Sequence, residues 1–483
     1  MRMRSIPRRY PRSAARVLGC GSWVLGATLA GLLSPGLARA GLEHAVVRGS
    51  AVVDAERDGP ASAARVSWAS LSSTPLPVGV YTLRFTVPAG PPARHAGLAP
   101  VFAVEIPVCQ NRGRLRIDGA WSELTPGPAI VPLDPAAPHR LDLEVRVSPY
   151  EKRIACGRAP VFGSVEVATA GLVALDFESP HAAAGGGRAV AYVPARHDLR
   201  APGALLVGVH PWNGGIWTYA AYAELLDAAE TEDVTLLMPS GLGNSLYTEA
   251  AEDEVMRAVR AFSREVALDA VRTSIWGASM GGQGAMTIGL HRPADFATIT
   301  SYFGDARFDV SGYVRAILPT EEKAHLVNPL DVIDNARHVP VWLIHGVDDA
   351  TSPVKESDLL KTALDKRGYA VRYDRVVGAG HEAPLVVRFL PEVVRRAGVS
   401  RAPRFPTRVT YRSVRPIDTG AYGVEIERVR PGDARVDVEH RDGAVRVLAA
   451  DNVATIRLRD GALGATRSTP TTLENGVKVA VVW

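Results

Sequence analysis

The chain has little cysteine. Only three of its 483 residues are cysteine, and no cysteine and histidine residues cluster at the spacing of a metal site. The sequence also has no detectable repeat and no low-complexity tract, which excludes repeat arrays and fibrous proteins. We therefore expect an ordinary globular protein that uses no metal or other cofactor. Its length predicts two or three domains in place of a single core.

The chain lacks a basic excess once its first forty residues are set aside. The formal net charge is +4, but residues 1–40 contain seven arginines and no acidic residue. Taking these seven from the 55 basic residues leaves 48, against 51 acidic ones. The overall positive charge therefore does not indicate a nucleic-acid partner.

Residues 1–40 have the three parts of a secretory signal. An arginine-rich start runs to Arg16, an apolar stretch covers about 17–33, and Ala38–Ala40 forms an A-x-A cleavage site. We predict cleavage before Gly41 and a secreted or periplasmic mature protein without a membrane span. The alternative is an uncleaved membrane anchor, for which the glycine-rich apolar stretch is barely long enough.

Two cysteines, Cys109 and Cys156, follow the predicted cleavage site. An exported protein meets an oxidising compartment, where an even number of cysteines favours disulfide formation. We predict one disulfide between them. The alternative is a pair of buried free thiols.

Three regions follow the predicted leader, residues 1–40. Residues 41–170 contain short runs of alternating apolar and polar residues, such as Leu141–Val147, and predict a β-sandwich accessory domain. Residues 171–398 alternate strand and helix patterns, which is typical of a doubly wound, mainly parallel sheet and places this region in the α/β class. Residues 403–483 again predict a small β domain, with a turn at Arg441–Gly443.

Seven strands and an amphipathic helix are predicted in the middle region. The helix spans Glu252–Val266, where apolar residues recur on one face. Several of the predicted strands are continuous apolar runs, as expected for strands buried on both faces. These strands are Arg188–Pro194, Ala204–His210, Val234–Pro239, Thr273–Trp276, Thr298–Phe303, Val339–His345 and Ala370–Val377.

One of these strands leads into the pattern Gly-x-Ser-x-Gly at Gly277–Gly281. Between a strand and a helix this pattern predicts a nucleophile elbow, with Ser279 exposed on a strained turn. A serine hydroxyl is a weak nucleophile at neutral pH, so it needs a base, a carboxylate that orients the base, and donors for the oxyanion.

Candidates for the acid and the base follow in the order that this architecture requires. Asp348 and Asp349 come directly after the strand that ends at His345, and either one can be the acid. His381 lies on a glycine-flanked loop after the next strand and is the predicted base.

The oxyanion donors are predicted to be backbone N–H groups. The first is that of Met280, directly after the nucleophile. The second comes from the loop at 209–215, where Pro211 has no N–H; Trp212 is preferred and Asn213 comes next.

Aromatic residues after this loop, Trp217 and Tyr219 among them, can line a pocket or belong to the core, because their spacing is helical. The segment at about 305–335 lies where such folds carry a lid over the substrate.

Together these motifs resemble a known group of enzymes. The segment Leu268–Gly282, the loop His345–Asp349 and the pair Gly380–His381 are similar to α/β-hydrolases grouped around prolyl oligopeptidases and secreted poly(3-hydroxybutyrate) depolymerase-type esterases. The resemblance covers about 180–398. It implies an α/β-hydrolase fold and favours Asp349 over Asp348 as the acid, giving the triad Ser279, Asp349 and His381.

The chain departs from this group in two places. Its oxyanion loop reads His210-Pro211 where the group has His-Gly. The roughly 130 residues ahead of the catalytic region are too few for the multi-bladed propeller of prolyl oligopeptidases.

The sequence therefore predicts an exported serine hydrolase that cleaves carboxylic esters, either small or polymeric. One alternative is a peptidase of the prolyl oligopeptidase type. Another is a catalytically inactive protein that binds a carbohydrate or polymer. The substrate and the oligomeric state do not follow from the residues.

Overall fold

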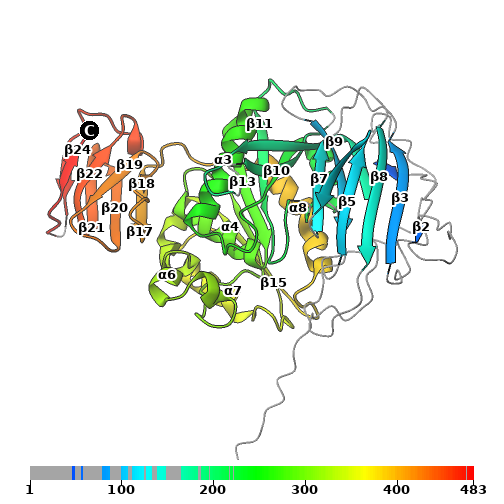
Figure 1. Ribbon diagram of the computed structural model, residues 1–483. Helices are drawn as coiled ribbons and strands as arrows, with labels where there is room; N and C mark the ends of the chain where they lie inside the picture. The colour runs from blue at the N-terminus through cyan, green and yellow to red at the C-terminus, as the bar shows by residue number, and fades with distance from the viewer. Residues whose placement is uncertain are drawn as a thin grey trace, which may run out of the picture.

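The structure is a computed structural model of the 483-residue chain (Figure 1). It describes residues 46–48, 56–57, 79–87, 99–106, 111–124, 127–132, 139–147, 165–182, 186–194, 196–216, 218–220, 222–474 and 476–483. The predicted leader, its cleavage site and both cysteines of the predicted disulfide, Cys109 and Cys156, lie outside these residues.

A mixed eleven-stranded sheet forms the centre of the described part of the chain. Its order is β16-β15-β14-β13-β11-β12-β10-β9-β4-β7, with β1 paired to β9. The six strands from β16 to β12 pair in parallel, whereas β10 and β9 are antiparallel. The strands from β9 on are β9 (Val165–Glu178), β10 (Gly186–Tyr192), β11 (Gly203–Val209), β12 (Val234–Pro239), β13 (Leu268–Ala278), β14 (Ile299–Tyr302), β15 (Val341–Gly346) and β16 (Val371–Val376).

All seven strands predicted for the middle region are present. The strands β11, β12, β14 and β15 are buried along their whole length, which explains why their sequences are runs of apolar residues without alternation. The edge strand β16 is only partly covered, and its sequence carries the charged residues Arg372, Asp374 and Arg375.

Helices cover both faces of the parallel part of the sheet (Figure 1). The apolar core on one face includes residues of α3, α4, η2 and α7, and the core on the other face includes residues of α2 and α8. The predicted amphipathic helix is confirmed as α3, with Val255 and Phe262 fully buried. The helices are α2 (Ala223–Glu232), α3 (Glu249–Glu265), α4 (Met280–His291), α5 (Val314–Ile317), α6 (Glu321–His325), η2 (Pro329–His338), α7 (Lys355–Asp365) and α8 (Ala383–Val399).

The strands at the N-terminal end are divided between two sheets. A five-stranded sheet has the order β2-β3-β8-β5-β6, whereas β1, β4 and β7 join the central sheet through β9. The predicted domain boundary at residue 170 falls inside β9, which pairs with both β10 and β4. These strands are β1 (Val46–Arg48), β2 (Glu56–Arg57), β3 (Gly79–Val87), β4 (Ala99–Ile106), β5 (Asn111–Ile117), β6 (Ala120–Leu124), β7 (Gly127–Pro132) and β8 (His139–Val147).

The C-terminal region consists of two four-stranded sheets that share one apolar core, on the left in Figure 1. Their orders are β17-β20-β21-β23 and β18-β19-β22-β24. The predicted turn at Arg441–Gly443 connects β20 and β21, with positive φ angles at Asp442 and Gly443. The elements are β17 (Arg408–Ser413), β18 (Gly420–Ala421), β19 (Val424–Arg428), β20 (Ala434–Arg441), β21 (Ala444–Asp451), β22 (Val453–Leu458), η3 (Ala462–Gly464), β23 (Thr471–Leu473) and β24 (Ala480–Val482).

Within the part of the chain that the structure describes, no helix has both the length and the apolar character needed to cross a membrane.

Candidate active site

Ser279 occupies a sharp turn between β13 and α4. Its φ of 59° and ψ of −122° lie in a region that residues with a side chain rarely adopt. Two features hold Ser279 in this strained conformation. Its N–H donates a hydrogen bond to the Tyr302 carbonyl of β14 at 2.9 Å, and α4 begins at the next residue. This is the backbone geometry of a nucleophile elbow.

Glycines let α4 approach the sheet closely at this turn. A Cβ added to Gly281 would lie 1.9 Å from the Val209 carbonyl oxygen of β11. One added to Gly277 would lie 2.4 Å from the Gly281 carbonyl oxygen. Because real Cβ atoms do not make such contacts, only glycine allows the turn to be this tight.

The buried side chain of Tyr219 holds the turn in place through two hydrogen bonds. The Tyr219 hydroxyl donates to the Val209 carbonyl and accepts the Ala278 N–H, both at 2.9 Å, so it links the ends of β11 and β13. Its side chain is 1% exposed. The structure therefore places Tyr219 in the core, the second of the two roles left open by the sequence, while Trp217 lies outside the described residues.

Asp349 and His381 are in direct contact. The Nδ1 of His381 lies 2.7 Å from Oδ2 of Asp349, while Oδ1 accepts the N–H groups of Thr351 and Ser352 at 2.8 and 2.9 Å. Asp349 is buried, whereas the neighbouring Asp348 is exposed. Of the two candidate acids, only Asp349 is therefore in place to orient His381.

The environment of Asp349 stabilises its ionised form. Burial raises the pKa of this carboxyl, but the hydrogen bonds from His345 and His381 outweigh burial and hold the pKa well below its usual range. His345 is itself fixed, with Nδ1 at 2.7 Å from the Ser357 hydroxyl and Nε2 at 2.8 Å from the Ser352 carbonyl. Sequence reasoning used His345 only as a marker of the loop.

Phe303 connects the base to the neighbouring strand. It follows β14, is fully buried, and its ring centroid lies 4.3 Å from that of His381. Its φ of 39° is unusual for a bulky residue, and its N–H donates to the Ile344 carbonyl of β15. No sequence motif indicated this residue, because an aromatic residue at a strand end has no distinctive pattern.

Among residues 211–215 of the oxyanion loop, only the Trp212 N–H has no acceptor within the described residues. Pro211 has none, the Asn213 N–H donates to the Asn244 side chain at 2.6 Å, and the Gly214 N–H donates to the Pro211 carbonyl at 2.9 Å. The Gly215 N–H donates to the Thr218 hydroxyl. The Trp212 N–H has no such acceptor among the described residues. Met280 is in the first turn of α4, where N–H groups have no acceptor within the helix.

A second carboxylate, missed by the sequence reasoning, lies beside this network. The Ser352 hydroxyl, whose own N–H donates to Asp349, donates to Oδ1 of Asp305 in the segment after β14. Burial raises the pKa of Asp305, and the charge of His381 counteracts this in part. Ser352 therefore links Asp305 to the carboxylate that contacts His381.

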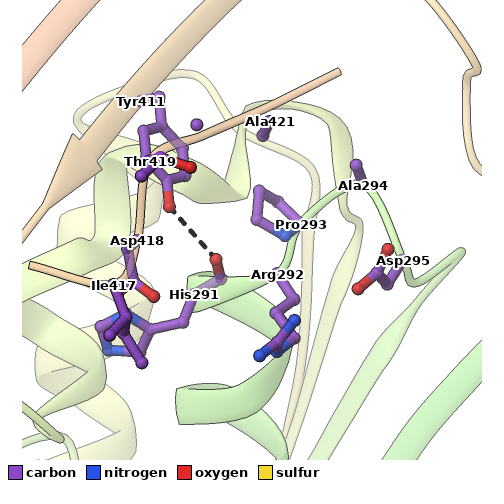
Figure 2. A pocket seen from close by; sticks show the side chains of 11 residues that line it. His291, Arg292, Pro293, Ala294, Asp295, Tyr411, Ile417, Asp418, Thr419 and Ala421 are labelled. Atoms are coloured by element: carbon purple, nitrogen blue, oxygen red, sulfur yellow. Dashed lines mark hydrogen bonds and ion pairs between the residues drawn. The ribbon is translucent and has the colours of Figure 1, made fainter. Parts of the chain in front are cut away.

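A polar cavity of about 170 Å³ lies elsewhere, at the C-terminal end of α4 (Figure 2). Its walls include His291 and Arg292 of the α4 end, together with Tyr411 and Asp418 of the C-terminal region. Ser279 precedes the other end of this twelve-residue helix, about 18 Å away at 1.5 Å per residue. The cavity is therefore separate from the candidate active site.

The fold and the elbow together define an α/β-hydrolase. The model of the prolyl oligopeptidase family matches residues 243–388, a stretch that contains Ser279, Asp349 and His381. This match confirms the predicted resemblance, and the chain is a hydrolase enzyme. A comparison with curated protein sequences gave no match.

Solved structures similar to the chain include esterases and peptidases. An S-formylglutathione hydrolase from Agrobacterium tumefaciens is 14% identical with a TM-score of 0.41, over 47% of this chain and 94% of that one. A fluorophosphonate-binding serine hydrolase of Staphylococcus aureus is 15% identical with a TM-score of 0.42, over 47% and 98%. A putative dipeptidyl aminopeptidase IV from Bacteroides ovatus is 12% identical with a TM-score of 0.42, over 47% and 36%.

Proposed function

We propose that the protein is an exported serine hydrolase that cleaves carboxylic esters through an acyl-enzyme. Ser279 is the nucleophile, His381 the general base and Asp349 the acid that orients it. The observation that carries the proposal is the 2.7 Å contact between Nδ1 of His381 and Oδ2 of Asp349. Ser279, which lies with them in residues 243–388, has the strained backbone geometry of a nucleophile elbow. The five-stranded N-terminal sheet and residues 403–483 are proposed to be accessory β regions.

The contact supports the proton positions that catalysis needs. Because Asp349 is held as a carboxylate, it accepts the Nδ1–H of His381, so that Nε2 is the nitrogen that takes a proton. The Ser279 hydroxyl gives its proton to Nε2 as Oγ bonds to the acyl carbon. His381 then passes this proton to the alcohol oxygen as the ester bond breaks.

Deacylation repeats these steps with water. A water molecule gives a proton to His381 and attacks the acyl carbon, and His381 returns the proton to Oγ of Ser279 as the acid leaves. In both half-reactions the N–H groups of Met280 and Trp212 donate hydrogen bonds to the negatively charged acyl oxygen.

The decisive experiment replaces the nucleophile. We expect Ser279→Ala to abolish hydrolysis of short 4-nitrophenyl esters and labelling by a fluorophosphonate probe, while the circular dichroism spectrum stays unchanged. Ser263→Ala, at an exposed position of α3, is the matched control and should keep both activities. Turnover or labelling that survives in the Ser279→Ala variant would overturn the mechanism.

A peptidase with the same triad is the second candidate. It is favoured by the family match over residues 243–388, since that family is named for peptidases. The chemistry at Ser279 is shared, so only the substrate distinguishes the two. Assaying proline-containing peptides against acyl esters at equal concentration decides between them, and a higher kcat/KM for the peptides would reverse our ranking.

Export is proposed from the leader. When the full chain is expressed in a Gram-negative host, the N-terminal sequence of the periplasmic or secreted protein should begin at Gly41. Alkylation under denaturing conditions should modify neither Cys109 nor Cys156 before reduction. A protein that keeps Met1, or that is recovered with the membranes, would contradict signal cleavage.

A further inference from the structure

The backbone of the oxyanion loop contacts the start of α4. A Cβ added to Gly281 would lie 1.9 Å from the carbonyl oxygen of Val209 and 2.9 Å from that of His210. Gly281 directly follows Met280, whose N–H is the first proposed oxyanion donor. Trp212, which carries the second proposed donor, comes two residues after His210. The position of this loop therefore decides whether both N–H groups reach the same acyl oxygen.

Trp212 occupies the second position of a β-turn. The Gly214 N–H donates to the Pro211 carbonyl at 2.9 Å, which closes the turn. Asn213, at the third position, has a φ of 58°, which asparagine and glycine tolerate better than other residues. The hydrogen bond that closes a β-turn does not use the N–H of its second residue. The Trp212 N–H is thus left for a ligand, provided that the turn keeps its orientation.

Two asparagines join this turn to a second loop, residues 240–247, which we call the supporting loop. The Asn213 N–H donates to Oδ1 of Asn244 at 2.6 Å, and Nδ2 of Asn244 donates to Oδ1 of Asn213 at 2.8 Å. Because the backbone N–H can only donate, it requires the oxygen of the Asn244 amide, which leaves Nδ2 for the Asn213 side chain. Two reciprocal bonds fix the orientation of the turn as well as its distance from the supporting loop.

The supporting loop is anchored at both of its ends. The Ser240 carbonyl oxygen lies 2.7 Å from Nε2 of the buried His210, and the hydroxyl of the fully buried Tyr247 donates to the His210 carbonyl at 3.0 Å. Leu242, Leu246 and Tyr247 have φ angles of 58°, 51° and 48°, which cost free energy in residues with a bulky side chain. Such angles persist only where the surrounding structure holds them, so the supporting loop is a firm base for the turn.

The asparagine pair also determines which N–H is left for the oxyanion. With Asn244 in place, the Asn213 N–H is already bonded, and among residues 211–215 the Trp212 N–H alone lacks an acceptor within the described part of the chain. Without the Asn244 amide, the turn would lose both bonds to the supporting loop. The Asn213 N–H would then compete for the same acyl oxygen.

We propose that Asn244 is a positioning residue of the oxyanion hole, whose reciprocal bonds with Asn213 hold the turn so that the Trp212 N–H meets the acyl oxygen. This inference rests on the proposed function, because the oxyanion forms only if Ser279 attacks an acyl carbon. The effect of Asn244 belongs to the transition state, since the acyl oxygen carries little charge in the bound ester. Both asparagines are exposed, so the pair is not part of the apolar core.

Replacing Asn244 tests the proposal. Removal of a complete oxyanion donor lowers kcat by about 10²–10³-fold, and a displaced donor should lose a part of this effect. We expect Asn244→Ala to lower kcat for 4-nitrophenyl butanoate roughly tenfold to a hundredfold, with KM within about twofold of the wild-type value. Active sites are counted by the 4-nitrophenolate released on complete inactivation with diethyl 4-nitrophenyl phosphate. A variant that only folds less well would have fewer active sites and an unchanged kcat per site.

A trifluoromethyl ketone provides a second measurement. 1,1,1-Trifluoropentan-2-one has the same chain as the butanoyl group, and its carbonyl carbon bonds to Oγ of Ser279 while the hydroxyl proton passes to His381. The product is a hemiketal with a negatively charged oxygen in the oxyanion hole. We expect the inhibition constant to rise in Asn244→Ala by about the factor by which kcat/KM falls. An unchanged inhibition constant would overturn the role of Asn244 in oxyanion binding.

Asn452→Ala is the matched control. The Asn452 side chain also bonds to the backbone of a neighbouring segment, where it accepts the Arg430 N–H at 3.1 Å and donates to the Arg430 carbonyl at 2.9 Å, but it lies in the C-terminal region. This variant should keep the wild-type kcat per active site. Asn213→Gly retains the N–H that Asn244 accepts, so its loss of kcat should be smaller than that of Asn244→Ala. The double variant should match Asn244→Ala within about threefold, because the two side chains act as a pair.

Three further outcomes would overturn the proposal. One is an Asn244→Ala enzyme with kcat per active site within about twofold of the wild type. The second is an equal loss in Asn452→Ala, and the third is a double variant in which the two single losses multiply. Failure of the proposed function is distinct, since Ser279→Ala would then keep its turnover of butanoate and the wild type would release no stoichiometric 4-nitrophenolate from the phosphate.

Discussion

At the scale of single residues, Asp348 and Asp349 show how position decides the role of a carboxylate. The two are neighbours in the sequence, but Asp349 is buried and accepts hydrogen bonds from two N–H groups and from His381, whereas Asp348 is exposed. These bonds lower the pKa of Asp349 despite its burial, so its carboxylate form is favoured.

This difference predicts opposite effects of the same substitution. Asp349→Asn should lower kcat about 10⁴-fold, because an amide can stabilise neither the required tautomer of His381 nor its charged form. Asp348→Asn should keep kcat within about twofold. The check is steady-state kinetics with a 4-nitrophenyl ester, and comparable losses in the two variants would show that the acid is wrongly assigned.

The low pKa of Asp349 also affects stability. A carboxyl whose pKa is lower in the folded than in the unfolded chain stabilises the fold above the unfolded pKa, about 3.9, and loses this effect as the pH falls toward the folded pKa. The free energy of unfolding of the wild type should therefore decrease relative to that of Asp349→Asn below about pH 4. Urea unfolding at pH 7 and pH 3.5 measures the difference.

At the scale of elements, the elbow depends on the close approach of α4 to β11 and β14. A Cβ added to Gly277 or Gly281 would lie too close to backbone atoms of β11 and α4, so these atoms fill the space that a side chain at either position would need. The packing fixes the first turn of α4, and with it the direction of the Met280 N–H. The glycines of the motif are thus needed for packing as much as for the turn itself.

Replacing Gly281 by alanine tests this dependence. The added Cβ meets the Val209 carbonyl at 1.9 Å, so α4 must shift, which we expect to destabilise the protein by about 1–3 kcal/mol and to reduce kcat strongly. Gly186→Ala is the control, since nothing lies within 4 Å of a Cβ there. Denaturant unfolding and ester kinetics measure both effects, and a Gly281→Ala enzyme with normal kcat would argue against this packing.

At the scale of the whole molecule, buried charges connect the hydrolase part to the C-terminal β region. Arg415, which is fully buried, pairs with Glu252 of α3 at 2.9 Å and with Asp418 at 2.8 Å. Glu252 also pairs with Arg292, and Asp418 with His291 at the end of α4, beside the cavity in Figure 2. The two parts are therefore joined by ion pairs whose carboxylates are buried.

Removing Arg415 should separate the effects of buried and exposed ion pairs. Arg415→Ala leaves buried Glu252 with Arg292 alone and buried Asp418 with His291 alone, which we expect to cost about 3–5 kcal/mol of unfolding free energy. Arg459→Ala breaks an exposed pair with Glu425 and should cost less than about 1 kcal/mol. Thermal and urea unfolding provide the comparison, and equal costs would show that the buried cluster does not hold the two regions together.

Much of the fold and of the candidate site could be predicted because the signals are local. Strand patterns, several of them continuous apolar runs, predicted all seven strands from β10 to β16, and Gly277–Gly281 placed the elbow between a strand and a helix. The contact between Asp349 and His381 followed from the rule that catalytic groups collect at the carboxyl ends of parallel strands. Other features, such as Phe303 against His381, depend on packing between distant segments and have no local pattern.

The sequence by itself determined the class of this protein, because alternating strands and helices and a glycine-bounded serine are imposed by backbone geometry. The tertiary structure alone decided what surrounds that serine. It placed Tyr219 in the core, separated Asp349 from Asp348 by burial, and brought Asp305 into a hydrogen bond with Ser352. Burial and the distances between charges arise only when remote segments pack together, so no stretch of the sequence could have shown them.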